Sequence, residues 1–218
     1  MMTGFRLGMA LAIAASGTAA VAMACGYGPV GPGTSRDFEV WVMDQSPSPG
    51  KTWGGRIFIY QDIVLRGVHT LASTPETVDL AGATTALCQS ATGAAPVQAH
   101  NVTFTRTYTH ALVAFLASGH VAILDAATRT PVACLQMTLG AMNMRHAHQA
   151  VASPDGSYIL VANQMGKLIE RIDANFATNT FTLNPAATIN LVTCHTPSGA
   201  ASRFSRRYAM YCVRSFGA

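Results

Sequence analysis

The sequence predicts an all-β fold that is built from a repeated four-stranded unit. One observation is the stretch His148–Asp173, which reads as a strand, a Ser-Pro-Asp-Gly turn, an apolar strand, a small turn and a third strand. Another is a match of the chain to itself at an offset of 48 residues, in which Val113–Asp125 overlays Val161–Asp173. In the same register, His100 overlays His148. A period of 40–50 residues with about four short strands is typical of β-propeller blades. We therefore expect a β-propeller-like protein of about three to four four-stranded blades in an incomplete ring.

The expected strands follow one another in three units. The first and weaker unit has strands at Val40–Asp44 and Arg56–Tyr60, separated by a long loop rich in Pro, Gly and Ser. The second and third units contain the two matched segments. The outermost strand of each unit is expected at Thr77–Leu80, Pro131–Leu135 and Thr188–Val192.

The repeat stops near residue 199. After Thr196–Gly199 a further turn and strand should follow, but the sequence becomes rich in arginine and loses the pattern. One interpretation is an irregular last strand at Arg207–Val213; the interpretation that we favour is a piece of a longer propeller. The blades are thus assigned to residues 38–199 and an irregular basic C-terminal tail to residues 200–218. Because an open stack of blades exposes strand edges, self-association is expected.

The N-terminal segment has the layout of an export signal. Arg6 supplies a positive charge, Leu7–Met23 is apolar, and the run Ala22-Met23-Ala24 places small residues at the cleavage positions. We expect a signal peptide at residues 1–24, a linker at residues 25–37 and an exported protein that is periplasmic or secreted. No later stretch reaches the roughly 18 apolar residues of a membrane span.

Cys25 follows the expected cleavage site directly. The residue after cleavage is the lipid-bearing cysteine in bacterial lipoproteins, and this arrangement resembles theirs. The usual Leu three places earlier is replaced here by Ala22. Two alternatives stay open: a lipid anchor through Cys25, or a plain cleaved signal.

The composition indicates one globular domain without a nucleic-acid partner. The chain has 218 residues, of which 50% are hydrophobic and 11% charged, and its net charge is +4. Four of the 14 basic residues lie in the last sixteen positions, and the remaining ten balance the ten acidic residues. The body of the protein is therefore electrically neutral, which disfavours a basic nucleic-acid surface.

A cluster of methionine and histidine is the main candidate for a metal site. In an extended chain, alternate residues share a face, so Met142, Met144, His146 and His148 would line up. Thioether and imidazole ligands together suit copper. Since His100 and His148 occupy equivalent positions on innermost strands, they should converge near the propeller axis. The candidate ligands are His100, Met144, His146 and His148; the alternative is that they line a solvated channel without a metal.

Two further histidines, His110 and His120, lie near the turns of the second unit and are expected at the surface. Asp125 and Asp173 end equivalent strands, and Asp155 lies in the Ser-Pro-Asp-Gly turn, so all three should accept backbone N–H hydrogen bonds. No nucleophile elbow, phosphate-binding loop or His-Glu-x-x-His motif occurs, so the sequence shows no catalytic site.

The cysteines after Cys25 show no Cys-x-x-Cys spacing. Cys88 and Cys134 each lie twelve residues before a histidine, at comparable places of neighbouring units. Like positions of neighbouring blades lie beyond the ~7 Å Cα separation that a disulfide allows. We therefore expect buried thiols here rather than a Cys88–Cys134 bridge, although export would permit disulfides.

The turn at Ser153–Gly156 and the strand at Ile159–Asn163 resemble the YVTN-type repeat family, relatives of the WD40 propellers. The resemblance covers roughly residues 38–192 and is strong in one unit. It implies a periplasmic propeller that binds a protein or a small ligand, and some members of such families carry redox or lactonase activity. Our leading hypothesis is an exported, non-enzymatic binding domain; the alternative is a copper-binding or redox-associated propeller. A hydrolytic or isomerising enzyme is a third hypothesis.

Overall fold

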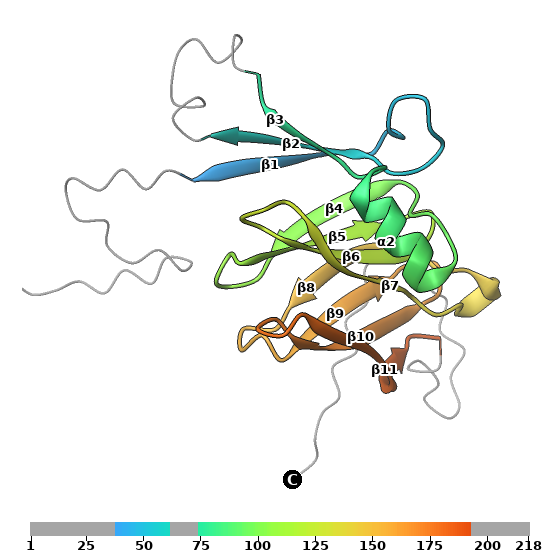
Figure 1. The fold of residues 1–218 in the computed structure, drawn as a ribbon. Helices are drawn as coiled ribbons and strands as arrows, with labels where there is room; N and C mark the ends of the chain where they lie inside the picture. The colour runs from blue at the N-terminus through green and yellow to red at the C-terminus, as the bar shows by residue number, and fades with distance from the viewer. Residues whose placement is uncertain (1–37, 62–73, 193–218) are drawn as a thin grey trace, which may run out of the picture. The chain divides into compact units, whose positions relative to one another are not determined.

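The computed structural model describes residues 38–61 and 74–192, which form three antiparallel sheets, one α-helix and one 3₁₀ turn (Figure 1). In every sheet each strand pairs with its neighbour in the sequence. This up-and-down order is the order of propeller blades, so the expected all-β, propeller-like fold is confirmed. No fourth sheet occurs in the described residues, so these blades do not close a ring. Within the same residues, no helix is both long and apolar enough to cross a membrane.

The first blade has three strands, β1 (Glu39–Asp44), β2 (Arg56–Gln61) and β3 (Glu76–Asp79), in the order β1-β2-β3. All three lie close to the ranges that the sequence predicts. On β2, Ile57 and Ile59 are buried while the residues between and beside them are more accessible. This alternation shows which face of the blade packs on the core.

A helix that the sequence did not predict, α2 (Ala83–Thr92), follows β3 where the other blades have a fourth strand. The helix begins after Gly82 and ends at Gly93, whose left-handed φ of 79° lets its N–H donate to the carbonyl of Gln89. A glycine in this conformation is the commonest end of a helix. The local sequence of α2 therefore contained a usable end signal.

The second blade consists of β4 (Ala99–Phe104), β5 (His110–Phe115), β6 (His120–Asp125) and β7 (Pro131–Gln136). Every residue of β5 is buried. A strand that is buried on both faces reads as a continuous apolar run rather than as an alternation. The second blade is thus covered on both sides, by the first blade and by the third.

The third blade consists of β8 (Ala147–Ala152), β9 (Tyr158–Asn163), β10 (Leu168–Asn175) and β11 (Thr180–Asn190). Along β9, Ile159 and Val161 are buried, whereas Leu160 between them is exposed. This blade therefore buries only the face that it turns toward the second blade.

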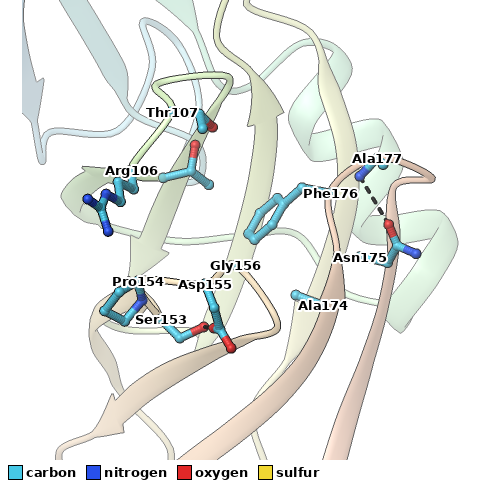
Figure 2. Close-up of a pocket in the computed structure, with 11 residues that line it drawn as sticks. Arg106, Thr107, Ser153, Pro154, Asp155, Gly156, Ala174, Asn175, Phe176 and Ala177 are labelled. Carbon is cyan, nitrogen blue, oxygen red and sulfur yellow. Dashed lines mark hydrogen bonds between the residues drawn. The ribbon is translucent and has the colours of Figure 1, made fainter.

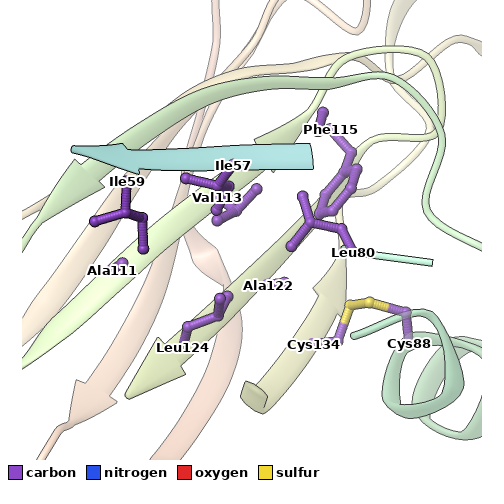
Figure 3. Close-up of a cluster of buried hydrophobic side chains, with 11 residues drawn as sticks. Ile57, Ile59, Leu80, Cys88, Ala111, Val113, Phe115, Ala122, Leu124 and Cys134 are labelled. Carbon is purple, nitrogen blue, oxygen red and sulfur yellow. A yellow bond between two sulfur atoms is a disulfide. The ribbon is translucent and has the colours of Figure 1, made fainter. Parts of the chain in front are cut away.

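Two hydrophobic clusters hold the blades together. The first joins Ile57 and Ile59 of β2 to Val113 and Phe115 of β5 (Figure 3). The second joins the opposite face of β5 to β9 and β10, and it includes Met137. Burial of apolar side chains on this scale is the main stabilising contribution of such a fold.

A disulfide joins Cys88 to Cys134, with a Cα–Cα distance of 5.0 Å (Figure 3). The expectation of two buried thiols is therefore wrong. It assumed that both cysteines lie on equivalent strands of neighbouring blades. Cys88 instead lies on α2, which contacts β7, the strand of Cys134. The helix brings its cysteine across the gap that would separate two equivalent strands.

The expectation that His120 lies at the surface is also wrong, because its side chain is completely buried. Its Nδ1 is 2.9 Å from Ser118 Oγ and its Nε2 is 2.9 Å from Thr92 Oγ1 on α2. Burial, and to a lesser degree the charge of Arg145, lowers the pKa of His120 to about 4. The ring is therefore neutral near pH 7 and connects α2 to the second blade.

Candidate functional site

A cavity of about 370 Å³ lies between the turns of the second and third blades (Figure 2). Three turns contribute to it: β4–β5, β8–β9 and β10–β11. The lining residues are Thr105, Arg106, Thr107, Ser153, Pro154, Asp155, Gly156, Ala174, Asn175, Phe176 and Ala177. The Ser-Pro-Asp-Gly turn of the sequence is thus part of a pocket wall.

Phe176 supplies the aromatic surface of the cavity, and its ring points toward the space between the turns (Figure 2). Its ring centroid lies 5.2 Å from that of Phe181 and 5.0 Å from that of His110 on β5. His110 is buried, contrary to the expected surface position, and its Nε2 lies 2.9 Å from Asn179 Oδ1. This contact between the second and third blades fixes the turn that carries Phe176.

Asp155 and Arg106 are the charged groups in the lining. The Asp155 carboxylate accepts hydrogen bonds from the hydroxyl groups of Ser153 and Ser157 and from the Ser157 N–H, as the sequence predicted for a turn residue. These bonds lower the pKa of Asp155 to about 2. The side chain of Arg106 is exposed and makes no hydrogen bond or ion pair within the described residues. Arg106 is therefore available to an anionic ligand.

His100 and His148 meet at the starts of β4 and β8, which are the strand ends away from the cavity, as their equivalent positions predict. Their Nε2 atoms are 3.2 Å apart, and the ring centroids are 4.5 Å apart at an interplanar angle of 59°. Burial first, and the neighbouring His148 second, lowers the pKa of His100. Its Nδ1 is buried and has no hydrogen-bond partner among the described residues.

The recorded contact joins His100 and His148 alone and does not include the other two candidate ligands. The chain does not run straight from Met142: a 3₁₀ turn spans Ala141–Asn143, and the φ of Met142 is 56°. The expected shared face of Met142, Met144, His146 and His148 is therefore broken at Met142. Met144 and His146 make backbone hydrogen bonds, to Ala141 and to the Asn163 side chain respectively. Among residues 38–61 and 74–192, no three His, Cys, Asp or Glu side chains lie close enough together to hold a metal ion.

A buried polar network that the sequence did not reveal holds the chain before β8. The carboxylate of Glu170 is fully buried and accepts hydrogen bonds from the Thr138 N–H and hydroxyl and from Asn163 Nδ2. Asn163 Oδ1 in turn accepts from the His146 N–H. Since buried polar groups need such partners, this network has a structural role. Its signal in the sequence is Glu170, a charged residue at an inward position of β10 between the apolar Leu168 and Ile172.

The acids at the strand ends also have structural roles. Asp125 accepts the backbone N–H groups of Ala127 and Thr128, as predicted. Asp173 differs, because it accepts hydrogen bonds from the side chains of Arg171 and Asn184. The other functional candidate, Cys25, and the basic tail lie outside the described residues, as do Cys194 and Cys212.

Three sequential antiparallel blades, packed face to face, define a β-propeller-type protein. Comparison with protein-family models gives no match, and comparison with curated protein sequences gives none either.

Several solved structures are similar to this chain. It resembles a provisionally assigned 6-phosphogluconolactonase from Bacteroides fragilis at 18% identity and a TM-score of 0.45, over 71% of this chain and 38% of that one. It resembles the periplasmic gluconolactonase PpgL of Pseudomonas aeruginosa at 11% identity and a TM-score of 0.42, over 63% of this chain and 38% of that one. It resembles the β-propeller domain of Cps50 (Swd1) from Myceliophteria thermophila at 13% identity and a TM-score of 0.40, over 66% of this chain and 40% of that one. The chain thus spans less than half the length of each of these structures.

Proposed function

We propose that this chain is a ligand-binding β-propeller module without catalytic activity, and that its binding site is the cavity between the second and third blades. The observation that carries the proposal is the cavity itself, of about 370 Å³. Pockets for small ligands range from about 300 to 1,000 Å³ and combine an apolar surface with a few polar groups. Phe176 supplies the apolar surface here, and Arg106 and the turn backbones supply the polar groups.

The lining favours a small carboxylate with a flat, apolar body. Arg106 carries a guanidinium that can donate two parallel hydrogen bonds to a carboxylate. Phe176 offers a ring face that His110 and Phe181 hold in place. A ligand of this chemistry would pair its acid with Arg106 while its body lies on Phe176.

The state of Asp155 supports binding rather than catalysis. A general base works best when its pKa lies near the working pH. The Ser153 and Ser157 hydrogen bonds lower the pKa of Asp155 to about 2, so it is a weak base at neutral pH. Its carboxylate oxygens already accept hydrogen bonds from Ser153 and Ser157 of the same turn. Asp155 therefore shapes the pocket wall, and its charge is compensated by the hydrogen bonds of its own turn.

Benzoate and benzamidine, which have similar size and opposite charge, test the proposed site. We expect benzoate to bind and benzamidine not to bind, with binding followed by NMR titration of the full chain. Arg106→Ala should weaken benzoate binding about tenfold, because a hydrogen bond to a charged group contributes about 1.5–3 kcal/mol and 1.4 kcal/mol is a factor of ten.

The matched control is Lys51→Ala, which removes an exposed cation from the β1–β2 loop and should leave benzoate affinity unchanged. Equal losses of benzoate affinity in Arg106→Ala and Lys51→Ala would contradict the cavity as the binding site. A dissociation constant for benzoate weaker than about 10 mM in the parent chain would contradict the ligand class.

We also propose that the protein works outside the cytoplasm. The N-terminal pattern of Arg6 and Leu7–Met23 supports this, and so does the Cys88–Cys134 disulfide, since disulfides persist in oxidising compartments. Cell fractionation of the full chain beside a Cys25→Ala variant tests the location. Cytoplasmic retention of the full chain would contradict export. A membrane-bound parent with a soluble variant would establish the lipid anchor.

Binding of a transition metal such as copper is a second candidate function. The 3.2 Å contact between His100 Nε2 and His148 Nε2 is the observation that favours it. This pair lies at the start of β4 and β8, whereas the cavity lies beyond their ends. The two candidate functions use separate residues, so each can be tested alone.

A further inference from the structure

We propose that His100 and His148 together bind one Cu²⁺ ion through their two Nε2 atoms, as a two-imidazole site whose remaining coordination positions are filled from solvent. This inference rests on the second candidate function and names its ligands and its metal. It also separates these two histidines from Met144 and His146, with which the sequence grouped them.

The distance between the two nitrogen atoms suits a shared ion. Imidazole nitrogen binds such metals at about 2.0–2.1 Å, so two nitrogens on one ion are about 2.9 Å apart at a right angle and about 3.4 Å apart at a tetrahedral angle. The observed separation of 3.2 Å lies between these values. The ring centroids are farther apart, at 4.5 Å, so the two rings converge on their Nε2 ends. An ion can therefore be accommodated with small side-chain adjustments.

The backbone aims both histidines in the same way. The pairing of β4 with β5 shifts register between Ala99 and Asn101, so His100 is the extra residue of a β-bulge. The pairing of β8 with β9 shifts in the same way between Ala147 and Gln149, around His148. Bulges redirect a side chain out of the regular alternation and are frequent beside functional sites. Two equivalent bulges, 48 residues apart, thus direct two imidazoles at each other.

The pair is accessible from solvent. The side chain of His148 is exposed, so an ion and its other ligands can reach the pair from solvent.

The ligand set selects the metal. Imidazole suits copper, nickel and zinc, and affinity for divalent ions is highest for Cu²⁺. A thioether would shift the preference toward Cu(I), but the two groups in contact here are both imidazoles. We therefore infer a Cu²⁺ site rather than the methionine-containing copper site that the sequence alone suggested.

Copper titration of the full chain, after removal of metals with EDTA, tests the site by calorimetry and by electron paramagnetic resonance. We expect His100→Asn and His148→Asn each to weaken Cu²⁺ binding at least tenfold and to remove nitrogen couplings from the spectrum. His146→Asn is the matched control, because it removes a neighbouring imidazole from the same segment and should retain the parental affinity. Circular dichroism of each variant confirms folding.

The outcomes separate the proposals. Binding that survives both His100→Asn and His148→Asn but is lost in His146→Asn would overturn the assignment of the ligands while metal binding stands. Absence of Cu²⁺ binding by the parent chain would overturn both the ligand pair and the second candidate function. Benzoate binding at the cavity is unaffected by either result.

Discussion

The second and third blades have equivalent strands but very different surroundings. Leu112 on β5 and Leu160 on β9 are separated by the 48-residue repeat, yet Leu112 is 0% exposed and Leu160 is 42% exposed. Both leucines lie on the face directed away from the first blade. The third blade covers Leu112, whereas no sheet in the described residues covers Leu160. The same residue in the same strand position is therefore a core residue in one blade and a surface residue in the next.

The neighbouring strands show a partial adaptation to this difference. Ile123 on β6 is fully buried beside Leu112, and its equivalent on β10 is Arg171. The Arg171 guanidinium lies 4.5 Å from the centroid of the Tyr158 ring and pairs with Asp173. A charged side chain here gives the outward face of the third blade a polar part, while Leu160 keeps an apolar part. The apolar pattern of a strand thus indicates which residues can be buried, and the neighbouring blade decides whether they are.

Replacing the two equivalent leucines by alanine gives the largest expected effect. Leu112→Ala should lower the free energy of unfolding by about 2–5 kcal/mol, because it removes a fully buried side chain and leaves a cavity. Leu160→Ala should lower it by about 1 kcal/mol or less, because this side chain already contacts solvent. Urea unfolding of both variants measures the difference. Equal losses would show that another part of the protein, or a second copy, covers Leu160.

Much of the fold follows from the sequence because strands and turns are local. The 48-residue repeat and the turn residues locate the strands of the second and third blades within a few residues, apart from the early start of β11. Helix α2 was missed because a repeat predicts what neighbouring units share and says nothing about a replaced element. The Cys88–Cys134 disulfide was missed for the same reason, since its geometry depends on that helix.

Of the two candidate sites, one could be predicted from the sequence and the other could not. The contact between His100 and His148 could be predicted, because equivalent residues on adjacent inner strands lie side by side. The cavity could not, because Arg106 and Phe176 come from turns whose approach depends on the packing of two blades. The burial of His110 and His120 likewise depends on partners distant in sequence, Asn179 and Thr92.

His120 gives a smaller, pH-dependent difference between the blades, since its equivalent in the third blade is Leu168. The pKa of His120 is lowered from 6.5 to about 4 in the folded state, so the unfolded chain takes up the proton first as the pH falls. The contribution of this group to stability is therefore present above pH 6.5 and is lost as the pH falls toward 4. The loss approaches about 1.4 kcal/mol per pH unit, or about 2 kcal/mol between pH 7 and pH 5.

His120→Leu, which introduces the residue of the third blade, should flatten this part of the pH profile in urea unfolding. Ser118 and Thr92 keep other hydrogen bonds, with Val97 and Cys88 respectively, so the variant should still fold. The slope between pH 7 and pH 5 is the measurement, because overall stability also changes with packing. A parental slope in the variant would assign the pH dependence to other groups, among them His100, whose pKa is also lowered.

The turns that lead into β5 and β9 give the smallest expected effect. Both close with the same hydrogen bond, from the N–H of Tyr108 to the Thr105 carbonyl and from the N–H of Gly156 to the Ser153 carbonyl. Both final residues have a left-handed backbone, with φ of 57° at Tyr108 and 73° at Gly156. A residue with a side chain loses about 1–2 kcal/mol in this conformation, whereas glycine adopts it freely.

Tyr108→Gly should therefore raise the free energy of unfolding by about 0.5 kcal/mol, after the entropy cost of the new glycine is subtracted. Gly156→Ala should lower it by about 1 kcal/mol, mainly through backbone strain, since the added Cβ would meet the Phe176 ring at an ordinary 3.6 Å. Thermal unfolding of the two variants beside the parent measures both shifts. A loss of stability in Tyr108→Gly would mean that the ring contact between Tyr108 and Phe104, at 6.2 Å, outweighs the relief of strain. Opposite shifts in the two variants would show that the equivalent turns require the same backbone, and that only the third blade carries the residue suited to it.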